Sequence, residues 1–231
     1  MNTVAYFRHF ADAIGWDGVS ARVGSGIEDG ERQTRVGRGR WDRGQSDVER
    51  RKRTRELIVE AASTVVALRG VRGATAAEII EVAGVGRNTF YEHFETSEAV
   101  VAEAVRRAAD EMNAAVVAAV GAAPTPRERL RALCSVWLTE LSRRATLLAA
   151  VCDGASEQRA SIVRALEGEL RGALDFARKS GAVGQTTTDG GRLSCVVGAF
   201  VGAAEHLVAH PLSDVRAMSE VLADVTLRAF R

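Results

Sequence analysis

The sequence predicts an all-α protein, and three observations support this fold class. Hydrophobic residues make up 46% of the 231 residues but aromatic residues only 5%, so alanine, valine and leucine must fill the core, as in packed helices. Apolar positions recur at helical spacing along most of the chain after residue 49. Residues 75–94, TAAEIIEVAGVGRNTFYEHF, have the pattern of two short helices joined by a glycine turn.

The first 49 residues form the least regular part of the chain, and we expect a disordered basic extension. Their composition is rich in Gly, Arg, Asp and Ser, with few large apolar residues. Between residues 32 and 55, ten Arg or Lys stand against three acids, a local charge of +7 in a chain whose net charge is +1. Composition favours a flexible tail. The alternative is a basic arm, in which Arg51, Lys52 and Arg53 contact DNA phosphates or reach the minor groove.

A first long helix is predicted from Arg50 to about Arg69. Its apolar stripe has helical spacing and consists of Ile58, Ala61, Val65 and Leu68. Gly70 ends it.

A second, short helix is predicted to begin after Thr75 and to end near Ala83. Thr75 and Glu78 have the spacing of a capping box, in which each side chain binds a backbone N–H of the other residue. Gly84 and Gly86 then interrupt the periodicity, because glycine adopts the backbone angles of a tight turn.

A third helix, starting near Arg87, has two different faces. Phe90 and Phe94 lie four residues apart on one face, and Arg87, Asn88 and Tyr91 share the opposite face. A capped helix, a glycine turn and a second helix with one polar face are typical of a helix-turn-helix, whose second helix enters the major groove of DNA.

The rest of the chain is predicted to be helical. Thr96 caps a fourth helix from Ser97 to about Val120, in which Val100, Val101, Ala104 and Val105 are expected to be buried. Prolines in residues 121–126 break the pattern. Further helices are expected at 127–141, up to about 152, at 156–179, at 192–209, and from a cap at Ser213 to the end of the chain.

Residues 57–101 resemble the DNA-binding domain of tetracycline-repressor-type (TetR family) regulators. The features that carry the resemblance are Ala61-Ala62, Gly70, Thr75, Ala83-Gly84-Val85, Phe90-Tyr91 and His93-Phe94. Two positions differ from the family pattern: Gly86 stands where the family usually has Ser, and Ser97 where it usually has a phosphate-binding Lys.

The resemblance implies a fold and a function. It places a helix-turn-helix domain at residues 50–112 and a helical ligand-binding and dimerisation domain at 113–231. It implies a cytoplasmic transcription regulator, expected to be a repressor that binds a pseudo-palindromic operator as a homodimer and is released by a small apolar effector. No cofactor is expected. The alternatives are an activator without a ligand and, from another class, a helical protein-interaction module.

The expected DNA contacts follow from side-chain chemistry and from the resemblance. Arg87 suits a bidentate contact with guanine, Asn88 one with adenine, and Thr89 a thymine methyl group or a phosphate. The resemblance assigns phosphate contacts to Tyr91, His93 and Thr75. The backbone N–H groups of Thr96 and Ser97 are further candidates, because they open a helix. Glu92 is expected to point away from DNA.

A small-molecule pocket is implied only by the resemblance. Its candidate lining residues are Trp137, Phe176 and Phe200, with Glu205 or His206 as a polar anchor. Each of these side chains could equally be ordinary core.

Other classes of function have little support in the sequence. His206 and His210 have a spacing that could hold a metal, but no HExxH pattern surrounds them, and no nucleophile or phosphate-loop motif is present, so we expect neither an enzyme nor a metal site. Three widely spaced cysteines suggest no disulfide framework. We expect no apolar run long enough to cross a membrane.

Overall fold

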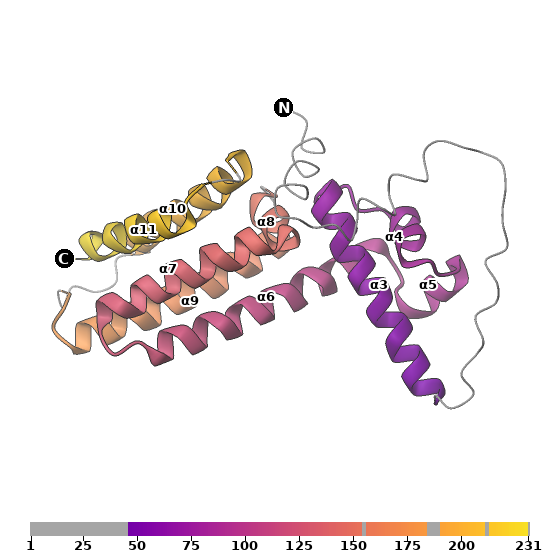
Figure 1. Ribbon diagram of the computed structural model, residues 1–231, viewed down its shortest axis with the longest axis horizontal. Helices are drawn as coiled ribbons and strands as arrows, with labels where there is room; N and C mark the ends of the chain where they lie inside the picture. Colours follow the sequence, from indigo (N-terminus) through magenta and orange to yellow (C-terminus); the bar gives the residue numbers. More distant parts are fainter. Residues whose placement is uncertain (1–45, 154–155, 184–189, 211–212, 231) are drawn as a thin grey trace.

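The computed structural model describes residues 46–153, 156–183, 190–210 and 213–230; the predicted extension up to residue 45 lies outside these ranges. All regular structure within them is helical, so the predicted all-α class is confirmed (Figure 1). The helices are α3 (Asp47–Arg69), α4 (Ala76–Ala83), α5 (Arg87–His93), α6 (Ser97–Ala122), α7 (Pro126–Arg143), α8 (Ala145–Cys152), α9 (Glu157–Lys179), α10 (Gly190–Ala209) and α11 (Val215–Ala229).

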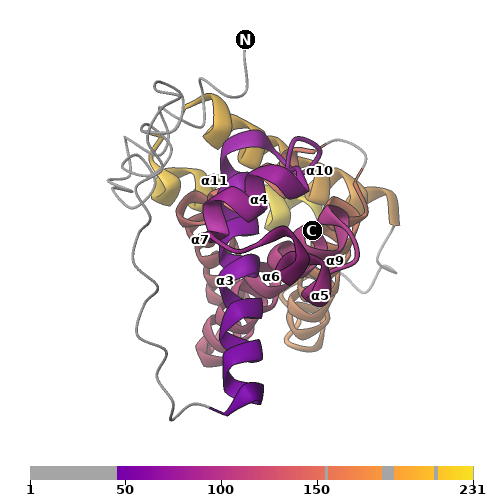
Figure 2. The same ribbon diagram turned by 90° about the vertical axis from the view of Figure 1, so that its right-hand side faces the viewer.

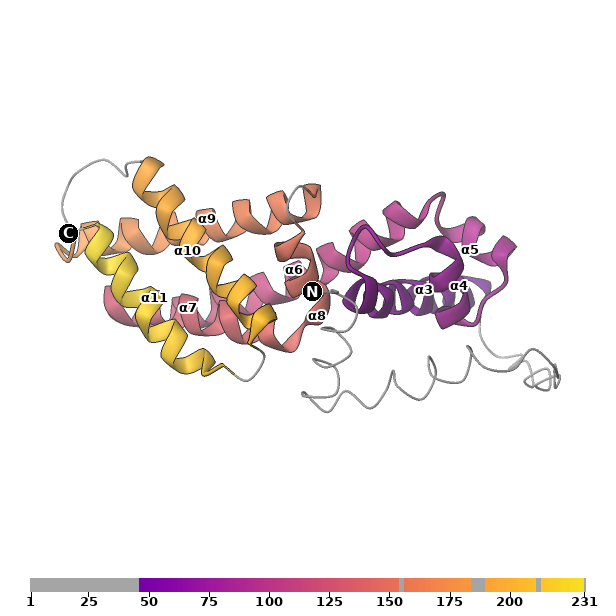
Figure 3. The same ribbon diagram turned by 90° about the horizontal axis from the view of Figure 1, so that it is seen from above.

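The molecule is elongated, and its two ends have different helices. α3, α4 and α5 lie at one end and α7 to α11 towards the other, while α6 runs from the first group into the second (Figures 1 and 3). α10 and α11 lie together on one side of α7 (Figure 1). The predicted division between residues 112 and 113 falls within α6, which is continuous.

Helix α3 begins at Asp47, three residues before the predicted start. Ser46 and Glu49 form a capping box there, with the Glu49 N–H donating to Ser46 Oγ and the Ser46 N–H to the Glu49 carboxylate. The sequence prediction missed this cap because it assigned these residues to the basic extension. The buried face of α3 includes Ile58, Ala61 and Val65, as the periodicity predicts, whereas Leu68, the fourth residue of the predicted stripe, is only partly buried.

The turn between α4 and α5 depends on Gly84, which adopts the left-handed conformation at φ 64° and ψ 28°. Thr75 caps α4 as predicted, by accepting the N–H of Glu78. The reciprocal part of the predicted capping box is wrong, because the Glu78 carboxylate instead accepts from the Thr75 hydroxyl and from Nε of Arg69 at 3.1 Å.

Thr96 caps α6 by accepting the N–H of Ala99, as predicted. The four residues expected to be buried in its first turns are buried: Val100, Val101, Ala104 and Val105. Beyond residue 110 the buried face of the same helix continues with Met112, Val116 and Val120. One helix therefore contributes to the core at both ends of the molecule.

The last helix starts differently from the prediction. Asp214, and not Ser213, caps α11 by accepting the N–H groups of Arg216 and Ala217. The Ser213 hydroxyl lies 3.2 Å from Nε2 of His206 on α10 instead. Ion pairs join α11 to α7, namely Arg127 with Asp224 at 3.2 Å and Arg131 with Glu220 at 2.6 Å.

Helix α10 contradicts the expectation that no run is long enough to span a membrane. An 18-residue window within it has a mean hydropathy of 1.3, which is sufficient by length and composition alone. Of that window 39% is buried inside the protein, and the buried residues of α10 include Leu193, Val196 and Phe200. A single helix of this kind is weak evidence for a membrane span.

Replacing Gly84 with Ala is expected to lower the free energy of unfolding by about 1 kcal/mol, because a Cβ strains the left-handed conformation. Nothing lies within 4 Å of the added atom, so backbone strain is the only penalty. Gly86 is the control: its φ is −71°, and Ser there gains a hydroxyl that can cap α5, so no loss is expected. Denaturant unfolding of both variants measures the difference, and equal losses would contradict this role of Gly84.

Candidate nucleic-acid interface

The candidate interface is built on α5, whose two faces are separated as predicted. Phe90 is fully buried and Phe94 is 5% exposed, and their rings pack with centroids 6.2 Å apart. Figure 2 shows the end of the molecule at which α4 and α5 lie. The aromatic face therefore anchors the helix and leaves its other face at that surface.

The outward face of α5 carries the predicted base-reading side chains. Arg87 and Asn88 are exposed, and Thr89 is partly buried. Tyr91 is 45% exposed; its ring packs edge-on against Phe90, and the Arg87 guanidinium lies 5.8 Å from its centroid. Arg87, Asn88 and Tyr91 are thus brought together, with their polar atoms directed away from the core.

The C-terminal end of α5 is bound by α3. Nη2 of Arg51 donates to the carbonyl oxygen of Glu92 at 3.4 Å, and Nη1 of Arg55 donates to that of His93 at 3.0 Å. Burial lowers the pKa of His93 from its ordinary 6.5, and the positive charges of Arg51 and Arg55 lower it further, against an opposing effect of Glu92. The imidazole is therefore mainly neutral at pH 7 in the free protein.

The other predicted DNA contacts have different surroundings. Lys52 and Arg53 are exposed on α3, and Lys52 has only a long contact of 4.0 Å with Glu56. Thr75 and Thr96 are exposed, and their hydroxyls already accept capping hydrogen bonds at the starts of α4 and α6.

The four candidate ligand residues do not form one cluster. Trp137 and Phe200 are buried and meet edge to face, with centroids 5.3 Å apart. Phe176 is partly buried under the guanidinium of Arg129, which lies 3.5 Å from the ring centroid. Glu205 is exposed on α10.

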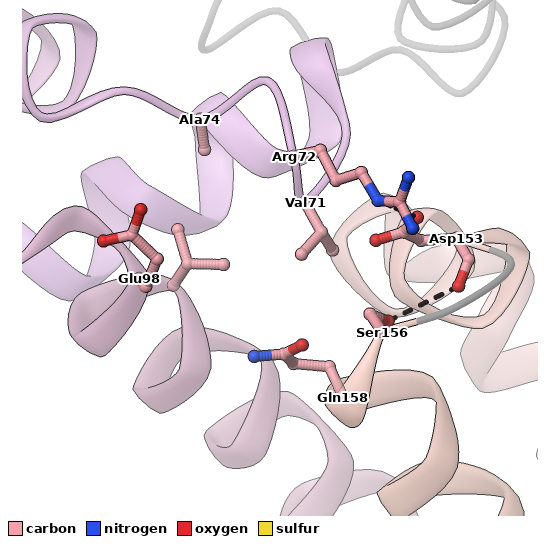
Figure 4. A pocket seen from close by; sticks show the side chains of 8 residues that line it. Val71, Arg72, Ala74, Glu98, Asp153, Ser156 and Gln158 are labelled. Carbon is pink, nitrogen blue, oxygen red and sulfur yellow. Dashed lines mark hydrogen bonds and ion pairs between the residues drawn. The ribbon is translucent and has the colours of Figure 1, made fainter.

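A cleft of about 350 Å³ lies elsewhere (Figure 4). Residues between α3 and α4 and at the start of α6 form one side of it, and residues at the end of α8 and the start of α9 form the other. Its lining consists of Val71, Arg72, Ala74, Glu98, Val101, Asp153, Ser156 and Gln158. Arg72 and Asp153 meet at one end, with Nε and Oδ1 3.1 Å apart, and Glu98 lies at the other. None of the candidate ligand residues lines this cleft.

Cysteines and histidines elsewhere in the described part of the chain have the following surroundings. Burial raises the pKa of Cys134 to about 12, and burial with the charge of Glu205 raises that of Cys152 to about 11, so both thiols are protonated at neutral pH. His206 and His210 stack with centroids 4.3 Å apart. In the part of the chain that the structure describes, no group of three or more His, Cys, Asp or Glu side chains could hold a metal ion.

Sequence reasoning missed the contacts between distant segments. Arg55 was counted only as part of the basic run, yet it joins α3 to α5 and, through an ion pair with Glu103, to α6. Likewise, the Thr146 hydroxyl on α8 donates to the carbonyl oxygen of Ser63 on α3 at 2.9 Å. These partners are separated by 38 to 83 residues, and no local pattern in the sequence indicates them.

Comparison with known proteins agrees with this geometry. Residues 58–104, which include all of α4 and α5, match the sequence profile of the bacterial regulatory proteins of the tetR family. No curated protein sequence matches the chain.

Several solved structures have the same fold. The fatty acid degradation regulator FadR from Bacillus halodurans is 20% identical, with a TM-score of 0.64 over 76% of this chain and 99% of that one. SmeT, the repressor of the Stenotrophomonas maltophilia multidrug efflux pump SmeDEF, is 24% identical, with a TM-score of 0.63 over 76% of this chain and 89% of that one.

FadR from Bacillus subtilis, in complex with stearoyl-CoA, is 17% identical, with a TM-score of 0.66 over 76% of this chain and 99% of that one. At these identities the likeness establishes the fold alone. The chain therefore has the fold of these TetR-type regulators, and its residues 58–104 match the tetR-family profile.

Proposed function

We propose that this chain is a non-enzymatic transcriptional repressor that binds a pseudo-palindromic DNA operator as a homodimer. The observation that carries the proposal is the outward face of α5, where Arg87 and Asn88 are exposed while Phe90 holds the opposite face in the core. Arginine pairs with the O6 and N7 edge of guanine, and asparagine with adenine, so this face can read bases in a major groove.

Phosphate contacts then place α5 in the groove. We assign them to Tyr91, His93 and Thr75, to the exposed cations Arg51, Lys52 and Arg53, and to the start of α6 at Thr96, while Thr89 lies between base and phosphate contacts. Such contacts fix the register of the domain on DNA without selecting a sequence. Arg51 also donates a hydrogen bond to the Glu92 carbonyl oxygen of α5, so in this proposal it both holds α5 and contacts a phosphate.

A dimer is supported by the surface of α10 and α11. Val221 is 63% exposed and Val225 44% exposed, one helical turn apart on α11. Gly198 and Gly202 are exposed on α10, one turn apart, and their small size permits close helix approach. One short helix reads only a few base pairs, and a two-fold dimer doubles this contact and fixes the spacing of the half-sites.

A small apolar effector is supported by the buried pair of Trp137 and Phe200. Trp137 is 2% exposed, and its indole N–H is buried without a hydrogen-bond partner among the described residues. A buried, unpaired donor is costly and would be satisfied by an acceptor on a bound molecule. Phe176 and Glu205, the other two candidates, lie apart from this pair, so the proposed effector site centres on Trp137 and Phe200. The Bacillus subtilis FadR structure contains stearoyl-CoA.

These assignments divide the chain into an extension (1–49), a DNA-binding domain (50–112) and a regulatory and dimerisation domain (113–231), with a cytoplasmic location. An activator without a ligand would share the DNA-binding surface. A helical protein-interaction module would show no salt-dependent affinity for DNA.

Selection of bound duplexes from a random DNA pool by the purified protein tests the proposal. An inverted repeat should be enriched, and Arg87→Ala should then lose roughly 1 to 3 kcal/mol of binding free energy, mainly through one base position in each half-site. Asp110→Asn, an exposed change on α6 away from α5, serves as the control. Absence of any enriched sequence, or unchanged affinity when Arg87, Asn88 and Tyr91 are all replaced, would exclude α5 as the reading helix.

Operator affinity is expected to rise by roughly twofold to fivefold as the pH falls from 8 to 6, through His93. The pKa of His93 lies below 6.5 in the free protein, and a neighbouring phosphate would stabilise the protonated imidazole. Binding to DNA is therefore accompanied by proton uptake at His93, and lower pH favours it. Fluorescence anisotropy across this pH range measures the effect. His93→Gln should flatten the profile, and a profile that keeps its slope in this variant would remove His93 from the phosphate contacts.

The double variant Val221→Glu and Val225→Glu is expected to shift the protein from dimer to monomer. Both side chains are exposed in the protomer, so the charges should disturb an interface and not the core. Val117→Glu on α6, where the native side chain is 51% exposed, is the matched control. Sedimentation equilibrium of the wild type, the double variant and the control measures their masses in solution. An unchanged mass for the double variant would place the dimer interface elsewhere.

A further inference from the structure

Arg55 lies at the meeting point of three helices. From α3, its Nη1 donates to the carbonyl oxygen of His93 at the end of α5 at 3.0 Å, and its Nη2 pairs with the Glu103 carboxylate on α6. Its guanidinium also lies 4.2 Å from the ring centroid of Phe94. Polar partners and an aromatic face therefore fix this side chain in one orientation.

These contacts separate Arg55 from the other cations of the basic run. Arg51, Lys52 and Arg53 are exposed, whereas Arg55 is partly buried, with both terminal nitrogens of its fork engaged within the protein. Arg55 uses two of its five N–H donors within the protein, while its side chain is 41% exposed. The charge pattern of the sequence thus groups together residues that have different roles.

The carbonyl contact matters because α5 is short. It has seven residues, and its last carbonyl groups have no partner within the helix. A cation at this end satisfies a carbonyl and interacts favourably with the negative end of the helix dipole. Arg55, together with the longer contact from Arg51 to the Glu92 carbonyl oxygen, therefore holds the C-terminal end of α5.

Glu103 fixes Arg55 from the other side. Its side chain is 18% exposed, and it lies between Val101 and Val105, which are buried on α6. The same helix continues without a break to Ala122, at the far end of the molecule. The position of α6 is consequently linked to α5 through two charge-assisted contacts.

We propose that Arg55 is a positioning residue for DNA recognition and not a phosphate contact, and that the Glu103 carboxylate orients it. The inference deepens the proposed function and depends on it for its effect on DNA affinity. The link itself exists in the free protein and can be tested there.

The substitution Glu103→Gln should change operator affinity in opposite directions under the two explanations, namely orientation of Arg55 by Glu103 or a simple effect of its charge. Removing a negative charge near DNA should tighten binding if charge alone matters. Loss of the orienting carboxylate should instead weaken operator binding, by roughly fivefold for a partly exposed ion pair. Asp110→Asn removes the same charge from an exposed, i,i+4 pair on the same helix and should leave affinity unchanged or slightly tighter. Binding by the Glu103 variant that equals or exceeds that of wild type would overturn the proposal.

Two substitutions of Arg55 distinguish a positioning role from a phosphate contact. Lysine keeps the charge but cannot make both fork contacts, so affinity should fall by about the same factor as for Glu103→Gln. In Arg55→Gln the slope of log affinity against log salt should stay at the wild-type value if no phosphate contact is lost. A slope reduced by about one would show that Arg55 contacts a phosphate.

Amide hydrogen exchange tests the link without DNA. In Glu103→Gln, the amides of residues 90–94 should exchange several-fold faster than in wild type, while those of α9 keep their rates. A merely structural role would accelerate exchange in both regions through global unfolding. If wild-type protein enriches no duplex, the proposed function fails, but the exchange rates still decide the positioning role: unchanged rates in residues 90–94 would overturn it.

Discussion

The burial of Phe90 is the constraint on which the DNA-binding end depends. A seven-residue helix is too short to be stable by itself in water, so α5 exists because its aromatic face is packed. Phe90 is fully buried with Ile58 and Ile79, and removing such a side chain from water contributes about 1.5 to 3 kcal/mol. The direction in which Arg87 and Asn88 point is therefore a consequence of core packing on the opposite face.

The two ends of the molecule are joined by more than the continuity of α6. Thr146 on α8 donates to a carbonyl oxygen of α3, and Arg72 pairs with Asp153 across the cleft. Further along, Arg144 pairs with Glu111 of α6. Helix α8 therefore contacts both α3 and α6, so the two ends of the molecule share several packed contacts besides α6 itself.

Most of the fold and part of the candidate site could be predicted from the sequence, because the signals involved are local. The spacing of Phe90 and Phe94 predicts one buried face on α5, and Gly84 marks the turn before it. Both residues are found as expected. The family resemblance had the same origin, since it rests on residues close together in the chain. The roles of the predicted contacts with DNA and effector stay predictions.

Two kinds of feature could not be predicted from the sequence: a cap for which two neighbouring residues compete, and contacts between residues that are far apart in the chain. Asp214 outcompetes Ser213 as a cap, because its carboxylate accepts two N–H groups at once and the Ser213 hydroxyl pairs with His206. Arg55 could not be separated from its basic neighbours, because Glu103 is 48 residues away.

The unbroken length of α6 has a mechanical consequence. A helix of 26 residues is about 39 Å long at 1.5 Å per residue, and no proline or cap interrupts it. Used as a lever, such a rod converts a tilt of about 5° at one end into a displacement of roughly 3 Å at the other. A hydrogen bond to a base edge is lost over a smaller distance than that. A tilt of that size originating at residues 112–122 would therefore displace the other end of α6 by more than a hydrogen bond tolerates.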